Sequence, residues 1–290
     1  MSFLDRIREC QVFNPTRYLP LTIGGTAIGR IARGFVEHLR PYSDVLSVTD
    51  KAVTVNDALA TYDARTAAFD AVVSDLNDRG LVSGWRGEAY PVGVTYSEPA
   101  CFEMERAAVP LFGVRGYGVH INGYVEKADG LHLWVATRSP TKQTAPGKLD
   151  QVVAGGQPAG MTLAGNVIKE CAEEANIPEA LAEKARPVGT VTYTTERPEG
   201  LRHDVLFNFD LKLPESFQPE NTDGEVECFE LWPIERVAQV IEETDRFKFN
   251  AALVIIDFLV RHGLIDADHR DYTEIVGGLH GGTSADRADK

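Results

Sequence analysis

A glycine-rich turn followed directly by a short acidic helix constrains this chain more than any other feature. The segment runs from Gly155 to Pro178 and reads GGQPAGMTLAGNVIKECAEEANIP. Residues 163–175 have helical spacing, and the helix is predicted to end at Asn176. Asparagine tolerates the left-handed conformation that closes a helix, and proline cannot continue one. The turn and the helix together therefore form a short, sharply bounded loop–helix–loop element.

Three carboxylates, Glu170, Glu173 and Glu174, lie at i, i+3 and i+4 on this helix and are expected to share a face. The opposite face is small and apolar and is predicted to pack on a sheet. Its residues are Ala164, Ile168, Ala172 and Ala175. Alone, such an acidic pattern is more often a solvated face. The preceding glycine turn, whose backbone N–H groups can approach an anion, favours a site for a hard divalent cation.

Strands and helices alternate around this element. A hairpin is predicted from the alternating residues 116–126 and 131–139, with its turn at Ala128-Asp129-Gly130. Further strands are predicted at 190–195, 205–213 and 226–232, and further helices at 233–243 and 250–262. Strands with helices on both sides predict the α/β class and an α/β/α sandwich for residues 109–275.

The flanking segments give weaker signals. Residues 1–108 are predicted to form a smaller α+β domain, with helices at 27–39 and 56–76 and short extended pieces within 84–94. Residues 276–290 are rich in Gly, Ser and Asp and are predicted to be a disordered tail.

Charge and composition exclude several classes of protein. The net charge of −14 repels nucleic-acid backbones, so no nucleic-acid polymer is expected as a partner. The N-terminus, MSFLDRIREC, carries charges where a signal peptide needs an apolar run, and no stretch approaches the roughly 18 apolar residues of a membrane helix. Four scattered cysteines without a CxxC pair are typical of reduced thiols. We expect a cytoplasmic protein with no membrane partner; a homodimer stays open.

The acidic segment resembles a Nudix box. That pattern is Gly, five residues, Glu, seven residues, Arg-Glu-aliphatic, one residue, Glu-Glu, one residue, Gly-aliphatic. Aligned without gaps, Gly155 takes the leading glycine, Glu170 the Glu after the Arg, Glu173 and Glu174 the paired Glu, and Ile177 the last aliphatic position. The resemblance implies the Nudix α/β/α sandwich with a mixed sheet.

Three positions depart from the pattern. Asn176 replaces the late glycine, a mild change for that conformation. Lys169 replaces the arginine and keeps the charge without the planar fork. Met161 replaces the first glutamate, which in the family braces the box and helps with metal binding. The number of metals and the rate are therefore open, while the three helix carboxylates remain.

Residues 10–265 are also similar to a Nudix subfamily that has its own N-terminal domain. In fungi a related segment is joined to thiamin pyrophosphokinase. Members of this group are implicated in removing damaged thiamin diphosphate, such as its oxo and oxy forms, so the resemblance implies that substrate. The matching pieces are Gly24-Gly25 with Gly29, Arg65-Thr66, Gly84-Trp85-Arg86 with Glu88, and His120 to Tyr124.

The resemblance also implies a mechanism in which Mg²⁺, or Mn²⁺ in its place, is held by Glu170, Glu173 and Glu174 and carries the diphosphate of a small substrate. A carboxylate accepts the proton of the attacking water. The candidates are Glu170, Glu174, Glu225 and Glu227, of which the last two lie on one side of an extended piece. Their alternative role is charge at a strand edge.

Phosphate binding is assigned to the turn and to nearby cations. The candidates are Gly155, Gly156, Lys169, Arg197 and Arg202, with His203 beside them. Four aromatic residues are candidates for stacking on a planar heterocycle, although scattered aromatics are more often core; they are Trp85, Tyr90, Trp134 and Tyr193. His120 is expected to be a hydrogen-bonded strand residue.

Two other functions remain open at this stage. Isopentenyl diphosphate isomerases share the Nudix fold but need a reactive cysteine, for which Cys101, Cys171 and Cys228 are available. A catalytically weak binding or sensor protein is favoured by Met161 and Lys169, although such proteins commonly lose the metal carboxylates that this chain keeps.

Overall fold

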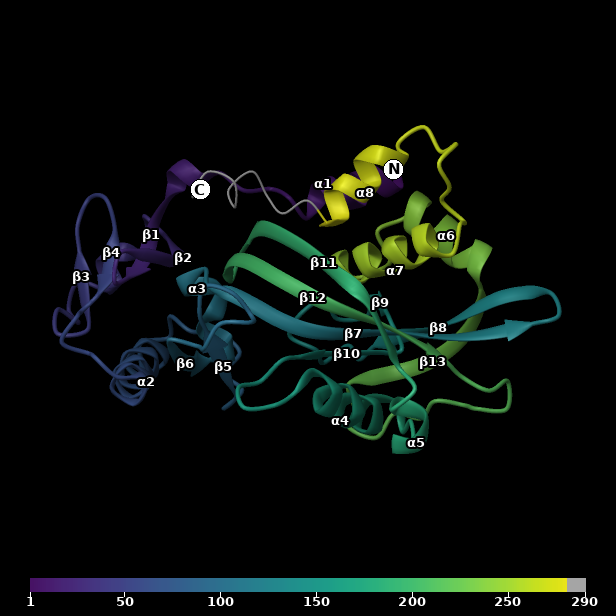
Figure 1. The fold of residues 1–290 in the computed structure, drawn as a ribbon, viewed down its shortest axis with the longest axis horizontal. Helices are drawn as coiled ribbons and strands as arrows, with labels where there is room; N and C mark the ends of the chain where they lie inside the picture. Colours follow the sequence, from purple (N-terminus) through teal and green to yellow (C-terminus); the bar gives the residue numbers. More distant parts are fainter. Residues whose placement is uncertain (281–290) are drawn as a thin grey trace.

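The computed structural model describes residues 1–280, which form an N-terminal α+β part and a larger part built on one sheet (Figure 1). The larger sheet has the strand order β11-β12-β7-β8-β13, with β10 paired to β7 and β9 paired to β8. Strands β12 and β7 are parallel and the other pairs antiparallel, so the sheet is mixed. The strands are β7 Arg115–Lys127, β8 Gly130–Arg138, β9 Leu149–Asp150, β10 Val153–Gly156, β11 Arg186–Arg197, β12 Gly200–Lys212 and β13 Val226–Pro233. The predicted hairpin is confirmed, with Lys127 paired to Gly130.

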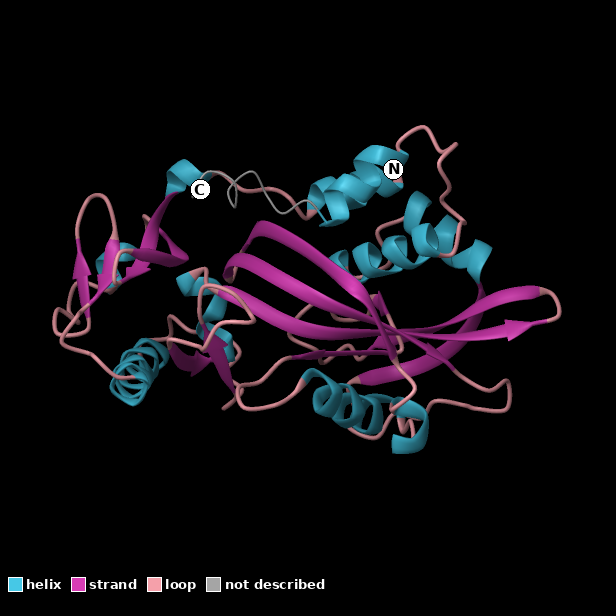
Figure 2. Cartoon of the chain, in the orientation of Figure 1, coloured by secondary structure: helices cyan, strands magenta, loops and turns pink. Residues whose placement is uncertain are grey.

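Helices cover both faces of this sheet (Figure 2). On one face α4 (Leu163–Ala175) and α5 (Glu179–Ala182) share a core with β7, including Val119 and Val167. On the other face α6 (Ile234–Glu243) and α7 (Phe249–Arg261) share a core with β8 and β12, including Val135 and Leu206. The predicted α/β/α sandwich is confirmed. Within residues 1–280, no helix has the length and apolar character that crossing a bilayer requires.

The N-terminal part has its own core around Phe69, Phe102 and Phe112. A four-stranded sheet of order β2-β1-β4-β3 lies beside a β5–β6 hairpin and the helix α2. The elements are β1 Tyr18–Ile23, β2 Thr26–Ala32, β3 Leu46–Val48, β4 Val53–Val55, α2 Tyr62–Asp78, β5 Ala89–Val92, β6 Phe102–Glu105 and α3 Val109–Phe112, with short 3-10 turns at Pro15–Arg17, Val36–His38 and Arg106–Ala108. The predicted α+β character is confirmed.

The helix predicted at 27–39 is wrong. Residues Thr26–Ala32 form strand β2, and only Val36–His38 make a 3-10 turn. Gly24 and Gly25 both have positive φ, at 55° and 83°, which lets them close a tight hairpin between β1 and β2. Pairing with β1 thus overrides the apolar spacing of Ile28 and Ile31, which is that of one helix face. The second predicted helix begins later than expected, at Tyr62, where Thr61 caps it.

The first and last helices of the described residues pack together on the larger part. Helix α1 (Phe3–Glu9) packs against α8 (Tyr272–His280), as Figure 1 shows, and Gln11 donates a hydrogen bond to the Gly278 carbonyl at 2.7 Å. Residues 276–280, predicted to be disordered, are therefore helical, because Ile275 and Leu279 are buried in the core that α1 shares. The rest of the predicted tail, 281–290, lies outside the described residues. The division at residue 108 stays a prediction.

Candidate active site

Helix α4 has the ends expected from the sequence. The Thr162 hydroxyl accepts a hydrogen bond from the Gly165 amide at 3.1 Å, and Asn176 closes the helix with φ 51°. Its packing face matches the prediction only at Ala175. The buried apolar stripe is Val167, Cys171 and Ala175, whereas the predicted Ala164 and Ala172 are exposed and Ile168 is only partly buried. The helix is turned so that two glutamates border the sheet instead of facing solvent.

This orientation of α4 buries Glu170 and Glu174, which are each 8% exposed. The Ala154 amide donates to Glu174 Oε2 at 2.8 Å. Gly155 leaves room for the neighbouring carboxylate, since a Cβ there would lie 2.2 Å from Glu170 Cδ. Burial raises the pKa of Glu170, and it raises the pKa of Glu174 to about 8 against the opposing hydrogen bond from Ala154. Burial therefore outweighs the contacts that favour the ionised forms, which are Lys169 at Glu170 and the Ala154 amide at Glu174.

Glu173 lies apart from this pair. Its side chain is 50% exposed and forms an ion pair with Lys169 at 2.7 Å. Lys169 also contacts Glu170, at 3.0 Å. Neither Lys169 nor Glu173 lines the pocket into which Glu170 and Glu174 open. To join these two on a cation, the Glu173 carboxylate would have to give up Lys169.

The pocket is formed by both parts of the chain and encloses about 1040 Å³, including the space open to solvent. Its cationic lining residues are Arg86, Arg106, Arg138, Lys142, Arg202 and Lys248, and its acidic ones are Glu170, Glu174, Asp204 and Glu225. Gly155 and Gly156 also line it. The pocket lining therefore has more cationic than acidic residues, although the chain has a net charge of −14. This lining favours a phosphorylated ligand.

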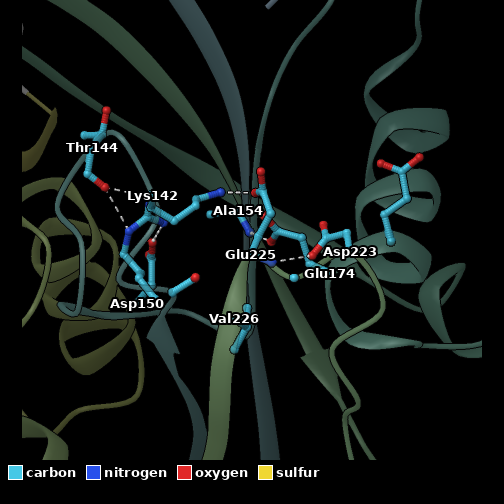
Figure 3. A network of polar contacts seen from close by, with 12 residues as sticks. Lys142, Thr144, Asp150, Ala154, Glu174, Asp223, Glu225 and Val226 are labelled. Carbon is cyan, nitrogen blue, oxygen red and sulfur yellow. Dashed lines mark hydrogen bonds and ion pairs between the residues drawn. The ribbon is translucent and has the colours of Figure 1, made fainter. Parts of the chain in front are cut away.

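An ion-pair network lies along one wall of the pocket, and Figure 3 shows its members Lys142, Asp150 and Glu225. Lys142 is paired with Glu225, while Arg138 and Lys248 contact Asp150 at 2.7 and 3.4 Å. Burial alone would raise the pKa of Asp150, but Lys248 and Arg138 outweigh it and hold that pKa below its usual range. Burial lowers the pKa of Lys142 to about 8. This wall therefore holds cations at fixed positions opposite Glu174.

Glu225 and Glu227 do not lie on one side of β13. The register with β8 shifts between Val226 and Cys228, so Glu227 falls in a bulge that breaks the alternation of side chains. Glu225 lines the pocket, whereas Glu227 is exposed and does not. Because β13 is an edge strand, Glu227 has the position expected of charge that discourages further pairing.

Of the cations predicted to bind phosphate, only Arg202 lines the pocket. Arg202 lines the pocket and contacts Glu199 at 3.0 Å and Asp204 at 3.7 Å. Arg197 does not line it; its guanidinium lies 4.1 Å from the centre of the Phe249 ring. His203 is likewise absent from the pocket lining.

Several pocket residues were given no role at the site by the sequence, namely Arg106, Lys142 and Lys248, and Arg86 was named only as part of a matching piece. Arg86, Tyr90 and Arg106 come from the N-terminal part, and Lys142 and Lys248 from loops of the larger part. Tyr90 had been considered only as a stacking or core residue. Two other aromatic candidates, Trp134 and Tyr193, are buried in the cores, and Trp85 is 39% exposed.

His120 is the hydrogen-bonded strand residue that the sequence predicted, with its Nδ1 3.1 Å from Gln151 Oε1, and it also borders the pocket. Burial lowers its pKa to about 4, so the imidazole is neutral at physiological pH.

The donor set of the pocket fits a hard divalent cation. Within residues 1–280, no group of three or more His, Cys, Asp or Glu is arranged to hold a metal ion. Magnesium, however, is commonly bound by only one or two carboxylates together with substrate phosphate. Glu170 and Glu174 supply such oxygens, and burial raises the pKa of both carboxyl groups, so a bound cation would stabilise their ionised forms.

Comparison with known proteins defines the class. A family model described as a domain of unknown function, DUF4743, matches residues 2–116. Nudix hydrolase 20, chloroplastic, from Arabidopsis thaliana is 43% identical over 285 residues, covering 94% of this chain and 76% of that protein. Nudix hydrolase 24, chloroplastic, from the same plant is 41% identical over 285 residues, covering 97% and 78%. The chain belongs to the Nudix hydrolase family.

It is accordingly an enzyme, a hydrolase acting on phosphoric anhydrides, and Nudix hydrolases generally use divalent metals such as Mg²⁺. An isomerase is disfavoured because no cysteine lines the described pocket, and burial raises the pKa of Cys171 to about 12. Among solved structures, a MutT protein from Methanosarcina mazei is 16% identical, with 50% of this chain and 94% of that chain covered and a TM-score of 0.38. Similarity this low says nothing about the substrate.

Proposed function

We propose that this chain is a magnesium-dependent pyrophosphohydrolase that cleaves a small organic diphosphate, with Mn²⁺ able to replace Mg²⁺. The observation that carries the proposal is the pair of buried carboxylates, Glu170 and Glu174, opening into a pocket that is otherwise rich in cations. The carboxylates would hold the cation, with Glu173 as a third ligand once it leaves Lys169. The cation, when bound, neutralises phosphate charge and lowers the pKa of a bound water.

The residues of the chain divide the remaining work. Arg202 and the cations of the wall opposite Glu174 bind and orient the phosphate oxygens. Glu225, an ion-paired carboxylate of the lining, accepts the proton from the attacking water at its carboxylate oxygen. Water adds to one phosphorus, the P–O–P bond breaks, and the products are a monophosphate and orthophosphate.

As the substrate we propose an oxidised thiamin diphosphate, in its oxo or oxy form. The similarity of residues 10–265 to the Nudix subfamily with its own N-terminal domain supports this choice, as does a pocket wall that contains the rings of Tyr90 and Tyr117. A cytoplasmic location, the absence of nucleic-acid and membrane partners, and the possible homodimer also stay proposals. Two plant relatives carry the word chloroplastic in their names.

A hydrolysis screen tests this function. Phosphate release is measured for the full chain with oxothiamin diphosphate, oxythiamin diphosphate, intact thiamin diphosphate, a nucleotide sugar and a dinucleotide, each with Mg²⁺, with Mn²⁺ and with EDTA. We expect metal-dependent release that is fastest with the oxidised thiamin diphosphates. A different preferred diphosphate would refute the substrate and keep the reaction. No metal-stimulated hydrolysis across the panel would refute the proposed function.

A further inference from the structure

The Tyr90 hydroxyl is a buried polar group without a partner at the wall of the pocket. Tyr90 is 5% exposed, and within the described residues its hydroxyl makes no hydrogen bond. Folded proteins rarely leave such a group unpaired, because burying a hydroxyl without a partner destabilises the fold. Since Tyr90 lines the same pocket as Glu170, an oxygen of a bound ligand is a candidate partner.

The position of Tyr90 is fixed from several sides. Tyr90 on β5 pairs with Met104 on β6. The Arg106 guanidinium lies 5.4 Å from the centre of the Tyr90 ring. Its hydroxyl stands against Gly156, where a Cβ would lie only 1.3 Å away. The Ala159 amide donates to the Ala89 carbonyl at 2.9 Å and ties β5 to the loop that precedes α4. The N-terminal part is thus docked directly on the glycine turn of the box.

Arg86 brings a free guanidinium to the same pocket. Each of the other five lining cations has a carboxylate partner, whereas the Arg86 side chain has none within residues 1–280. Its loop is nevertheless held in place, because buried Glu105 accepts hydrogen bonds from the Arg86 and Glu88 amides at 2.9 and 3.1 Å. Gly84 packs against Gln143 of the larger part. The guanidinium therefore extends from an anchored loop.

We propose that Tyr90 and Arg86 form a substrate subsite that the N-terminal part supplies to the active site. Both groups are hydrogen-bond donors without an acceptor, so the subsite takes an oxygen acceptor, a carbonyl or an anionic oxygen, on the organic group of the diphosphate. This inference rests on the proposed hydrolysis of an organic diphosphate. It adds that the enzyme selects diphosphates whose organic group carries such an oxygen.

Two variants test the subsite without touching the catalytic carboxylates. Tyr90→Phe removes only the hydroxyl, and Arg86→Ala removes the free guanidinium. Controls are Tyr42→Phe, which loses a hydrogen bond to Asp75, and Arg40→Ala, which loses a contact with Glu37; neither residue lines the pocket. The kcat and KM are measured with the best substrate of the hydrolysis screen. The inhibition constant of inorganic pyrophosphate, which has no organic group, and the thermal midpoint are measured for each protein.

We expect KM to rise about tenfold in each variant, as for the loss of one hydrogen bond to substrate, with kcat changed less. The pyrophosphate inhibition constant should stay within about twofold, and Arg86→Lys should recover part of the KM. Tyr90→Phe should melt no lower than the wild type, because it removes an unpaired hydroxyl. An unchanged KM in both variants, or a lower melting midpoint of Tyr90→Phe with unchanged KM, overturns the subsite alone. A wild-type enzyme that hydrolyses no diphosphate overturns the proposed function and the subsite with it.

Discussion

Single atoms decide the shape of this active site, and the two glycines of the turn show how. A Cβ on Gly155 would clash with the Glu170 carboxylate, and a Cβ on Gly156 would clash with the Tyr90 hydroxyl. The sequence identified both glycines and both buried glutamates, because turn, helix and caps lie within one local segment. It gave Tyr90 only as a stacking candidate and did not place Arg86 at the site, since the contacts of Tyr90 with Gly156 and of Gly84 with Gln143 join segments far apart in the chain.

The bulge in β13 gives a matched pair of glutamates for testing the proton acceptor. Glu225→Gln should lower kcat by on the order of a hundredfold or more, because it replaces the carboxylate proposed to accept the proton. Glu227→Gln changes the same residue type two positions away, outside the pocket, and should leave kcat near the wild-type value. Steady-state kinetics with saturating Mg²⁺ distinguish them. Equal kcat for the two variants would move the base to Glu170 or Glu174.

At the scale of elements, prediction succeeded where the signals were local and failed where pairing decided. Helix α4 was predicted at about 163–175 and is confirmed, because its helical spacing and its Asn176 cap lie within one segment. Strand β2 was predicted as a helix, because Ile28 and Ile31 have the spacing of one helix face and the pairing with β1 that favours a strand is not visible in this segment alone. Helix α8 was missed because its stability comes from α1, at the other end of the chain.

The contact between α8 and α7 is expected to depend on pH. His280 Nε2 lies 3.2 Å from Asp257 Oδ1, and this partner raises the pKa of His280 above its ordinary value of 6.5. A raised pKa in the folded state stabilises the fold fully below pH 6.5, and that stabilisation is lost as the pH rises through the folded-state pKa.

His280→Gln should therefore lower the free energy of unfolding at pH 5.5 by about 0.5 kcal/mol, a small value because the side chain is partly exposed and screened. At pH 9 the loss should be close to zero. Urea unfolding of the variant and the wild type at both pH values measures the difference. A loss of equal size at both pH values would show that the charge of His280 plays no part.

The whole molecule joins an N-terminal α+β part to a Nudix sandwich, and the described pocket takes residues from both. Such a pocket was not predictable from the sequence, which assigned the metal and phosphate chemistry to residues 109–275 and named only stacking aromatics and one cysteine in residues 1–108. What it did indicate was the family, through the resemblance of one local segment to a Nudix box, and the plant relatives confirm it. The net charge of −14 gave no indication of the cationic pocket lining, because a net charge does not show how charges are distributed over the fold.

The central claim is that Glu170 and Glu174 bind the divalent cation on which hydrolysis in this pocket depends. The most direct measurement is the Mg²⁺ dependence of phosphate release by Glu174→Gln, beside the wild type and Glu179→Gln, an exposed glutamate on α5. The account predicts that Glu174→Gln loses about a hundredfold or more in kcat at any Mg²⁺ concentration, while Glu179→Gln matches the wild type. Turnover by Glu174→Gln at the wild-type rate, with the same Mg²⁺ dependence, would contradict it.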